Sequence, residues 1–386
     1  MRRFLVPALQ VGPGQTGVGV YTLELIRALS QATLDDEEFV VAAPHPREFD
    51  FLQGIEGFSV EPIQLLRDDS WGRMMATHTT VPRVAERLGV DLVMGVNFIA
   101  PLWGRFATSV LVHDLTFHHY PATMPRMKRL YYQFVVRRSI RRSKVVFVTT
   151  KTMARELAEY EPGAVRKIRI APGGVPSAYL VNGEEEGRGR SRLQGRPRSS
   201  FLFVGTLEPR KNLERLLTAH AALCRFDPDF PALRVVGGRG WEDAGIRRTI
   251  LAHPDPSRLQ ILGYCNPSDL LKEYDGALAL LFPSLYEGFG LPALEAMARG
   301  CPVLTSKGIA TAEVTEDAAL LVDPLDGGEL ERAMRRLADD SSLRDRLAAA
   351  GLNRARSFTW ERGAEKTLRA LREPDLLPAR GDQVGR

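Results

Sequence analysis

Short apolar runs bounded by turn residues alternate with longer amphipathic stretches through the first half of the chain. Such runs are typical of buried strands, and apolar positions spaced three or four residues apart are typical of helices. The pattern predicts strands at residues 4–9, 39–43, 92–96, 109–112 and 145–149, and helices at 18–30, 72–88, 125–142 and 152–160. Strands that alternate with helices favour a parallel sheet covered on both faces.

The pattern stops at residues 182–199, which are rich in Gly, Arg and Glu and have no apolar periodicity, as expected of a linker or exposed loop. It then resumes, with strands predicted at 201–204, 233–236, 259–262, 277–282, 302–305 and 320–322, and helices that include 213–225, 292–299, 328–338 and 342–356. The sequence therefore predicts an α/β protein with two doubly wound, Rossmann-like domains, residues 1–181 and 200–357, that face each other across a cleft. Ligands in such sheets bind at the carboxyl ends of the strands.

Length and composition agree with this organisation. A chain of 386 residues exceeds what one core usually spans, and its formal charge of +5 is a mild excess that does not predict a nucleic-acid partner. Its three cysteines lie far apart, which argues against a disulfide framework and favours a reducing compartment. The N-terminus is interpreted as a first strand, and no stretch approaches the roughly 20 apolar residues that span a bilayer. We expect a cytoplasmic protein, either soluble or peripheral on the inner face of the plasma membrane.

The first candidate motif is a G-x-G-x-x-G pattern formed by Gly12, Gly14 and Gly17. A dinucleotide site also needs an acidic residue at the end of the second strand, but here the acidic residues 35–38 precede that strand. This placement argues against an NAD-dependent oxidoreductase. The turn, with Gly17 and Gly19 opening the helix, either approaches a phosphate or sugar closely or serves packing alone.

The second half contains a strand that ends at Gly205, followed by the adjacent cations Arg210 and Lys211. Asn212 occupies a position typical of a helix N-cap. Two cations between a strand end and a helix N-terminus are suited to a phosphate or diphosphate, although such dipeptides are more often solvated surface.

A second segment, residues 277–300, combines a buried strand, a Gly-rich loop and a helix start. Glu287 lies in the loop, and Glu295 lies about one turn into the helix. Carboxylates accept hydrogen bonds from hydroxyls, and the backbone N–H groups near Gly290 and Leu291 suit phosphate or sugar oxygens. For Glu295 the alternative is a residue that only complements the helix dipole.

His113 ends another predicted strand, and His118 and His119 follow it. No cysteine or carboxylate cluster completes a zinc site there, so we expect no metal. His113 suits a hydrogen bond to substrate, with a structural histidine as the alternative.

Residues 125–144 predict a basic amphipathic helix, because eight Arg and Lys residues occur without an acidic one. Met127, Leu130, Tyr131 and Phe134 form its apolar stripe. This pattern is typical of peripheral contact with an anionic membrane, and equally of a domain helix whose stripe is core.

Together these segments resemble the GT-B-fold glycosyltransferases, specifically the retaining glycosyltransferase family 4, over nearly the whole chain. The strongest element is the E-x7-E pair Glu287 and Glu295 in EGFGLPALE, followed by Arg210 and Lys211 in GTLEPRKN. Supporting elements are TGVGVYTLELIRAL near the N-terminus, HDL at 113–115, VGGRGW at 236–241 and AALLVDPLD at 318–326.

The resemblance implies that the C-terminal domain binds a nucleotide sugar and the N-terminal domain an acceptor, without a metal or other cofactor. It implies catalytic roles for Glu287 at the donor sugar, His113 beside it, and Arg210 and Lys211 at the diphosphate. It implies that Glu295 holds the ribose, and the residues that contact the donor or acceptor would further comprise Gly205, Phe289, Gly290, Leu291, Gly17 and Gly19. A C-terminal helix within 358–378 would join the first domain, as often in this family.

The sequence looks most similar to bacterial mannosyltransferases of surface-polysaccharide assembly. GDP-mannose is therefore the first expected donor, and a glycan or lipid-linked glycan the expected acceptor. A UDP-hexose or dTDP-rhamnose donor, a non-catalytic nucleotide-sugar-binding protein and an NAD-dependent oxidoreductase are the alternatives.

Overall fold

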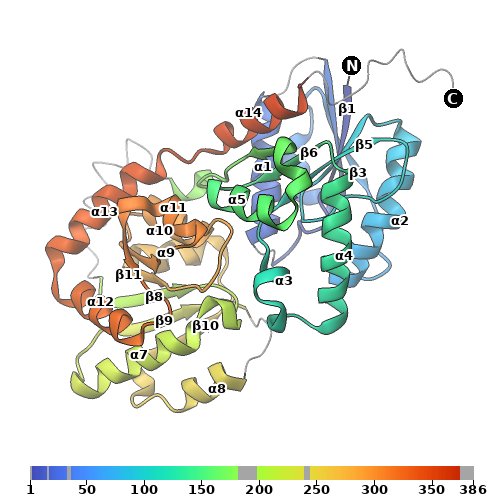
Figure 1. Ribbon diagram of the computed structural model, residues 1–386. Coiled ribbons are helices and arrows are strands. Elements are labelled where there is room, and N and C mark those ends of the chain that lie inside the picture. Colours follow the sequence, from blue (N-terminus) through green and yellow to red (C-terminus); the bar gives the residue numbers. More distant parts are fainter. Residues whose placement is uncertain (1, 15–16, 33–35, 181–197, 239–243, 374–386) are drawn as a thin grey trace. The chain divides into compact units, whose positions relative to one another are not determined.

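The structure is a computed structural model that describes residues 2–14, 17–32, 36–180, 198–238 and 244–373. The chain divides into two compact units (Figure 1). The first consists of residues 1–119, 124–174 and 360–386, and the second of residues 120–123 and 175–359. Each unit is built on one parallel sheet.

The first unit contains a seven-stranded sheet in the order β3-β2-β1-β4-β5-β6-β7. Its strands are β1 (Arg2–Pro7), β2 (Glu37–Ala43), β3 (Phe58–Pro62), β4 (Leu92–Gly95), β5 (Ala107–Val112), β6 (Val145–Val148) and β7 (Ile168–Ile170). The helices are α1 (Gly17–Ala32), α2 (Ser70–Leu88), α3 (Thr116–His119), α4 (Arg126–Arg142), α5 (Lys151–Tyr160) and α14 (Trp360–Leu371). The strand order reverses between β1 and β4, and ligands bind at such switch points in open α/β sheets.

The last helix, α14, belongs to this first unit, where it packs against α1. The Trp360 ring meets the Tyr21 ring edge-on at 4.9 Å, and Tyr21 donates a hydrogen bond of 2.8 Å to the Ala171 carbonyl. At the other end of α14, Arg372 holds Glu37 through two hydrogen bonds of 2.7 and 2.6 Å. The chain thus returns to its first domain after completing the second.

The second unit contains a six-stranded sheet in the order β10-β9-β8-β11-β12-β13. Its strands are β8 (Ser200–Val204), β9 (Ala232–Val236), β10 (Leu259–Gly263), β11 (Ala277–Phe282), β12 (Val303–Ser306) and β13 (Ala319–Val322). The helices are α7 (Leu213–Phe226), α8 (Ala244–Leu251), α9 (Pro267–Gly276), α10 (Leu291–Ala298), α11 (Ala310–Thr315), α12 (Gly327–Asp339) and α13 (Ser341–Ala355). Here the order reverses between β8 and β11.

Both faces of the second sheet are buried, as the side chains of β8 demonstrate. Phe201 and Phe203 pack into a core with α7 and α12, whereas Leu202 and Val204 pack into another with α9 and α10. Because successive side chains of a strand point to opposite faces, helices on both sides are needed to bury all four. The continuous apolar runs in the sequence have this physical cause.

Several details differ from the sequence predictions. The sequence analysis did not predict the edge strands β3 and β7. The second unit begins at Val175 rather than after residue 181, because Val175 and Tyr179 pack in its core and the Val175 N–H bonds the Phe358 carbonyl at 3.0 Å. The predicted linker at 182–199 lies outside the described residues except for its last two positions. The β2 strand begins two residues earlier than predicted, at Glu37, so the acidic residues lie at its start and not at its carboxyl end.

No helix among the described residues is both long and apolar enough to cross a membrane.

Candidate functional site

Arg210, Lys211 and Glu287 form a buried ionic cluster at the switch point of the second sheet. Arg210 and Lys211 come from the 3-10 turn Pro209–Lys211 after β8, and Glu287 comes from the loop after β11. Lys211 Nζ lies 2.5 Å from one carboxylate oxygen of Glu287, and an Arg210 nitrogen lies 2.9 Å from the other. The Leu285 N–H also bonds the Arg210 carbonyl at 2.8 Å, so the two loops are joined through backbone as well as side chains.

The carboxylate of Glu287 and the two cations stabilise one another where little water reaches them. Glu287 and Lys211 are each only 7% exposed. Burial alone would raise the pKa of Glu287, but the neighbouring Arg210 and Lys211 outweigh it and lower the pKa to about 2. Burial and the charge of Arg210 lower the pKa of Lys211, against the opposing pull of Glu287. Glu287 is therefore ionised at neutral pH and cannot carry a proton there.

Glu208 is a member of this cluster that the sequence analysis did not single out. Its carboxylate lies 2.9 Å from Arg210 and accepts a hydrogen bond of 2.9 Å from the Thr206 hydroxyl. Arg210 is thus held between two carboxylates, Glu208 and Glu287. The adjacent acid in the GTLEPRKN motif was the available sequence signal, because it precedes the cations by only two or three residues.

Asn212 occupies the N-cap position of α7, as predicted, but its side chain does not cap the helix. It precedes the helix with a left-handed backbone (φ 59°), and its side chain makes no capping hydrogen bond. Its amide instead donates to the carbonyls of Pro283 at 3.0 Å and Pro324 at 2.7 Å. The side chain therefore connects the loops after three strands, a tertiary role that local sequence rules cannot reveal.

Glu295 lies within α10, apart from the ionic contacts of Glu287. It is 7% exposed, and the Tyr274 hydroxyl donates to it at 2.9 Å. Burial raises the pKa of Glu295 to about 7, and the Tyr274 hydrogen bond lowers it only in part. A half-ionised carboxyl that has only this one hydrogen-bond donor, among the described residues, retains acceptor capacity for hydroxyl groups.

The start of α10 is shaped by Gly290. Its φ of +93° suits glycine, and a Cβ there would lie 2.7 Å from the Thr311 hydroxyl oxygen. The helix begins at Leu291, whereas the Phe289 side chain is 7% exposed and packs edge-on against Phe358. Gly205, at the end of β8, borders the aliphatic stem of Lys211.

His113 belongs to the first unit, at the carboxyl end of β5. Its Nε2 donates a hydrogen bond of 2.9 Å to the Val96 carbonyl, and its ring meets those of Tyr21 and Phe98 edge-on. Burial lowers the pKa of His113, so the ring is neutral at pH 7 and Nδ1 is its acceptor. Phe98 has a left-handed backbone (φ 58°), which is rare for a large side chain and is common beside functional sites.

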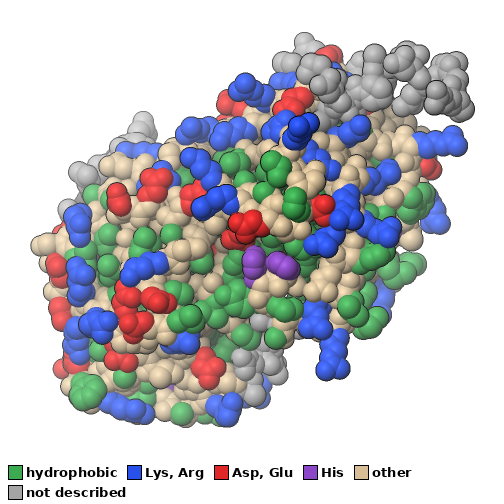
Figure 2. All heavy atoms as spheres, in the orientation of Figure 1, with side chains coloured by type: hydrophobic (Ala, Val, Ile, Leu, Met, Phe, Trp, Pro, Cys, Tyr) green, Lys and Arg blue, Asp and Glu red, His purple; other side chains and the backbone are tan. Residues whose placement is uncertain are grey.

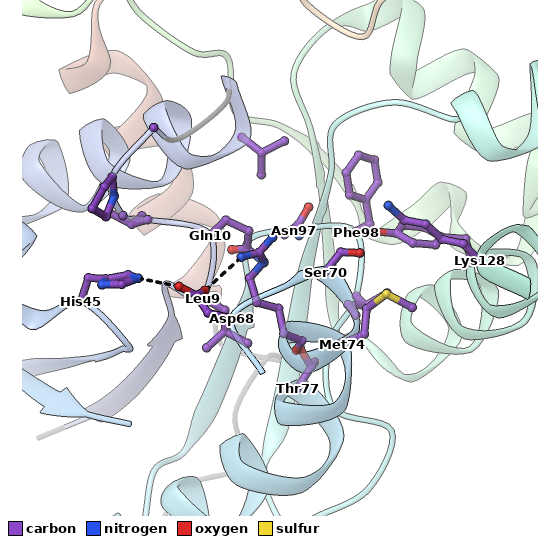
Figure 3. A pocket seen from close by; sticks show the side chains of 18 residues that line it. Leu9, Gln10, His45, Asp68, Ser70, Met74, Thr77, Asn97, Phe98 and Lys128 are labelled. Carbon is purple, nitrogen blue, oxygen red and sulfur yellow. Dashed lines mark hydrogen bonds and ion pairs between the residues drawn. The ribbon is translucent and has the colours of Figure 1, made fainter. Parts of the chain in front are cut away.

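A pocket of about 560 Å³ lies at the switch point of the first sheet (Figure 3). It is lined by residues 9–14 after β1 and 97–99 after β4, with Arg73 and Lys128 among its polar side chains. Gly12 and Gly14 line it, whereas Gly17 is the exposed first residue of α1 and Gly19 is buried within that helix. This pocket is therefore lined by the glycines that precede Gly17 and Gly19, and the predicted approach of a ligand to Gly17 and Gly19 stays a prediction.

The basic helix α4 exposes most of its apolar stripe. Met127, Leu130 and Phe134 are 68%, 57% and 56% exposed, so the alternative that they form core is wrong. The buried side of α4 is made by Val135, Val136, Ser139 and Ile140. In Figure 2, Lys and Arg side chains lie among hydrophobic ones in the region where Figure 1 places α4.

Comparisons with known proteins identify both halves of the chain. The Glycosyltransferase Family 4 sequence model matches residues 15–179, and that of the glycosyl transferases group 1 matches residues 191–354. The O-antigen chain mannosyltransferase B of Escherichia coli is 27% identical over 380 residues, which cover 92% of this chain and 96% of that one.

Solved structures share the fold at low identity. Sucrose-phosphate synthase of Thermosynechococcus elongatus superposes with a TM-score of 0.75 at 19% identity, over 96% of this chain and 98% of its own. HepE of Anabaena, solved with UDP and glucose, superposes with a TM-score of 0.71 at 16% identity, over 96% and 99%. Two parallel-sheet domains with these structural relatives constitute the GT-B fold.

Proposed function

Because the chain belongs to the glycosyltransferases, with a family 4 segment followed by a group 1 segment, we propose that it transfers a mannosyl residue from GDP-mannose to a growing polysaccharide or lipid-linked glycan, retaining the anomeric configuration. The observation that carries the proposal is the buried cluster of Arg210, Lys211 and Glu287 at the switch point of the second sheet. The name of the Escherichia coli relative supports mannose as the sugar.

Arg210 and Lys211 would stabilise the leaving group. When the bond between the sugar C1 and the diphosphate breaks, negative charge develops on the departing phosphate oxygens. Preorganised cations in a water-poor site stabilise such charge more strongly than they would in water. The backbone N–H groups at Gly290 and Leu291, at the start of α10, add two donors. In this arrangement the protein's own cations take the place of a metal, and transfer needs neither a metal nor another cofactor.

Glu287 would act as a fixed anion rather than as an acid or base. Its pKa of about 2 keeps it ionised, so it orients both cations and accepts a hydrogen bond from a hydroxyl of the donor sugar. In the proposed step the acceptor oxygen bonds to C1 on the face that the diphosphate leaves, and the acceptor proton passes to the departing phosphate. No carboxylate nucleophile is needed.

The remaining groups would complete the two substrate sites. Glu295 suits the ribose hydroxyls, because it is buried and Tyr274 already orients it. The pocket of the first unit suits a hydroxyl-rich acceptor, since it offers Lys128, the ion pair of Arg73 with Asp68, and amide and hydroxyl groups. His113 contacts Phe98 of that pocket and presents the acceptor atom Nδ1.

A thermal-shift panel with GDP-mannose, UDP-glucose, dTDP-rhamnose and NADH tests the donor. A ligand at 100 times its Kd adds about 2.7 kcal/mol of stability, which gives a clear shift. Stabilisation by GDP-mannose, followed by α-mannoside formation seen by NMR with and without Mg²⁺, supports the proposal. Stabilisation by another nucleotide sugar instead would refute GDP-mannose as the donor. Stabilisation by NADH alone, or a product with inverted anomeric configuration, would refute the proposed reaction.

We also propose that α4 attaches the enzyme to the anionic inner face of the plasma membrane. Met127, Leu130 and Phe134 follow one another at spacings of three and four residues, so they share one face of the helix. Tyr131 binds His78 of α2 at 2.8 Å and meets the Trp71 ring, which extends the apolar surface onto α2. Exposed apolar side chains flanked by cations favour binding to anionic lipid.

Vesicle sedimentation tests this attachment. We expect binding to vesicles that contain phosphatidylglycerol but not to pure phosphatidylcholine, and weaker binding at high salt. Phe134→Ser should reduce binding, whereas Phe226→Ser, which removes an 87% exposed ring on α7 of the second unit, serves as the matched control. Equal binding by both variants, or by both kinds of vesicle, would contradict the proposal.

A further inference from the structure

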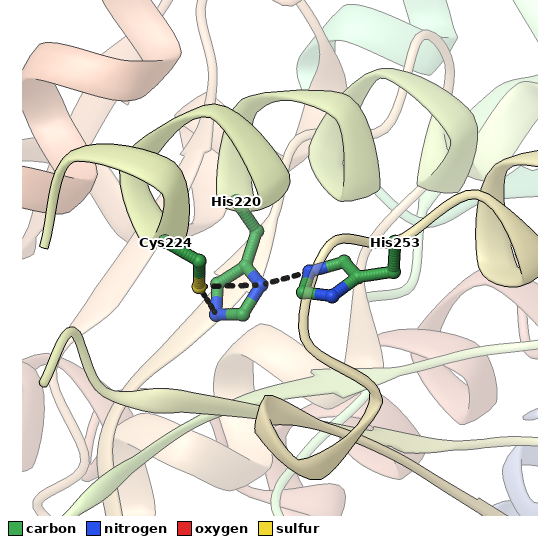
Figure 4. Close-up of side chains that lie close together, drawn as sticks. All are labelled: His220, Cys224 and His253. Atoms are coloured by element: carbon green, nitrogen blue, oxygen red, sulfur yellow. Dashed lines mark hydrogen bonds between the residues drawn. The ribbon is translucent and has the colours of Figure 1, made fainter. Parts of the chain in front are cut away.

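His220, Cys224 and His253 bring three metal-binding atoms together inside the second unit (Figure 4). His220 and Cys224 lie one turn apart on α7, and His253 follows α8. Nδ1 of His220 lies 3.0 Å from Nε2 of His253 and 3.8 Å from the Cys224 sulfur. The three residues are 0%, 7% and 5% exposed in chain order, and none of them takes part in the proposed transfer reaction.

The hydrogen bonds on the far side of each ring determine where its proton lies. His220 Nε2 lies 2.9 Å from the Pro231 carbonyl, and His253 Nδ1 lies 2.8 Å from the Asp255 carbonyl. A carbonyl only accepts, so these nitrogens carry the hydrogens. In two neutral rings with these tautomers the remaining nitrogens face each other with their lone pairs, and only a cation between them would make that arrangement favourable.

A shared proton is one candidate for this cation, but burial works against it. His220 and His253 are 0% and 5% exposed, so a charged imidazolium would lie away from water. A second possibility reverses the tautomer of His253, since the Asp255 N–H lies 3.3 Å from its Nδ1. Nε2–H would then donate to His220. This alternative relies on the contact of His253 Nδ1 with the Asp255 N–H, which is longer than its contact with the Asp255 carbonyl. The NMR experiment below distinguishes the two.

We propose that Nδ1 of His220, Nε2 of His253 and the sulfur of Cys224 bind one zinc ion. Zinc bonds of about 2.05 Å to nitrogen and 2.3 Å to sulfur, at tetrahedral angles, separate two nitrogens by about 3.3 Å and nitrogen from sulfur by about 3.6 Å. The observed 3.0 and 3.8 Å from Nδ1 each lie within a few tenths of an ångström of these values. The sulfur is also 3.8 Å from Nε2 of the same ring (Figure 4), so the His220 ring would turn to present Nδ1 to the metal.

The chemistry of the donors selects this kind of metal. Two imidazoles and a thiolate suit zinc and exclude the hard cations magnesium and calcium, which take oxygen ligands. The carbonyls of Pro231 and Asp255 supply the outer hydrogen bonds that usually orient metal-bound histidines. Water would complete the fourth position.

The site would cross-link α7 to the segment after α8 and take no part in catalysis. His220 lies nine residues beyond Lys211, which corresponds to about 13 Å along a helix at 1.5 Å per residue. The zinc proposal therefore stands apart from the proposed transfer reaction, and failure of either leaves the other intact.

Metal analysis of the untagged full-length chain tests the site. After incubation with equimolar zinc under reducing conditions and dialysis, we expect one zinc per chain in the wild type. Cys265→Ser, which changes a half-buried cysteine outside the cluster, is the matched control and should retain zinc. Cys224→Ser should lose most of it. A wild type without zinc, or equal zinc in Cys224→Ser, overturns the proposal.

Cobalt substitution tests the ligands without relying on a variant. Cobalt bound to thiolate gives a near-ultraviolet charge-transfer band, which we expect in the wild type and in Cys265→Ser. Selective ¹⁵N labelling of histidine should show metal-dependent shifts of His220 Nδ1 and His253 Nε2. A persistent N–H···N bond between the two rings after zinc addition would establish the tautomeric pair and overturn the proposal.

Discussion

Replacing Glu287 by glutamine removes the negative charge from between Arg210 and Lys211 while keeping the size of the side chain. The pKa of Glu287 falls from 4.5 to about 2 in the folded protein. At 1.36 kcal/mol per pKa unit, its ionised form is therefore stabilised by about 3 kcal/mol relative to the unfolded chain. The side chain is only 7% exposed, so solvent screening reduces this little.

The sign of the pH dependence follows from linkage. A carboxyl whose pKa is lowered by folding contributes its full stability above pH 4.5 and loses it as the pH falls toward 2. Urea denaturation should therefore show Glu287→Gln about 3 kcal/mol less stable than the wild type at pH 7, with a difference that shrinks in acid.

Transfer by Glu287→Gln should fall by about 10²- to 10³-fold, the usual cost of one lost electrostatic contact at a reacting centre. The fold should survive, because the expected loss is below the 5–15 kcal/mol that stabilises typical domains. Glu214→Gln, which changes an exposed glutamate in the first turn of α7, is the matched control. Normal transfer, or a stability difference that is independent of pH, would refute the assignment of Glu287.

Three further outcomes follow from the same contacts. In urea denaturation, Glu295→Gln should be more stable than the wild type by about 3 kcal/mol at pH 8 and nearly equal at pH 4. Folding raises the pKa of Glu295 to about 7, so the wild type loses folding stability as the pH rises from 4.5 through that value, and the glutamine does not. A stability difference that is the same at pH 4 and pH 8 would contradict the raised pKa of Glu295. Glu208→Gln should bind GDP-mannose about tenfold more tightly in calorimetry, since Arg210 loses a competing carboxylate; weaker binding would assign Glu208 to the site itself. Arg372→Met should lower the free energy of unfolding by about 2 kcal/mol and speed hydrogen exchange in α14, because it leaves the 2% exposed Glu37 without this partner. A change confined to the second unit would contradict that reasoning.

Much of the site could be predicted because its residues are local in sequence. Arg210 and Lys211 are adjacent, and Glu287 follows a strand whose apolar run is unmistakable. Parallel neighbouring strands bring their carboxyl ends to one edge, which places the two loops together. Which side chains contact one another, however, depended on the tertiary structure. Glu208 takes part in the cluster, and Asn212 joins the loops after three strands instead of capping α7.

The sequence by itself determined the α/β class, the alternation of strands and helices apart from β3 and β7, and the segments that carry the chemistry, because periodicity and turn residues are properties of neighbouring positions. It did not determine which distant groups meet. His220 and Cys224 are four residues apart on a predicted helix, but His253 joins them only when α8 packs beside α7. The exposure of Met127 was likewise decided by packing, since a stripe on α4 looks the same in sequence whether it meets core or water. Burial, proton positions and pKa values arise from contacts between segments far apart in the chain, and only the tertiary structure specifies those contacts.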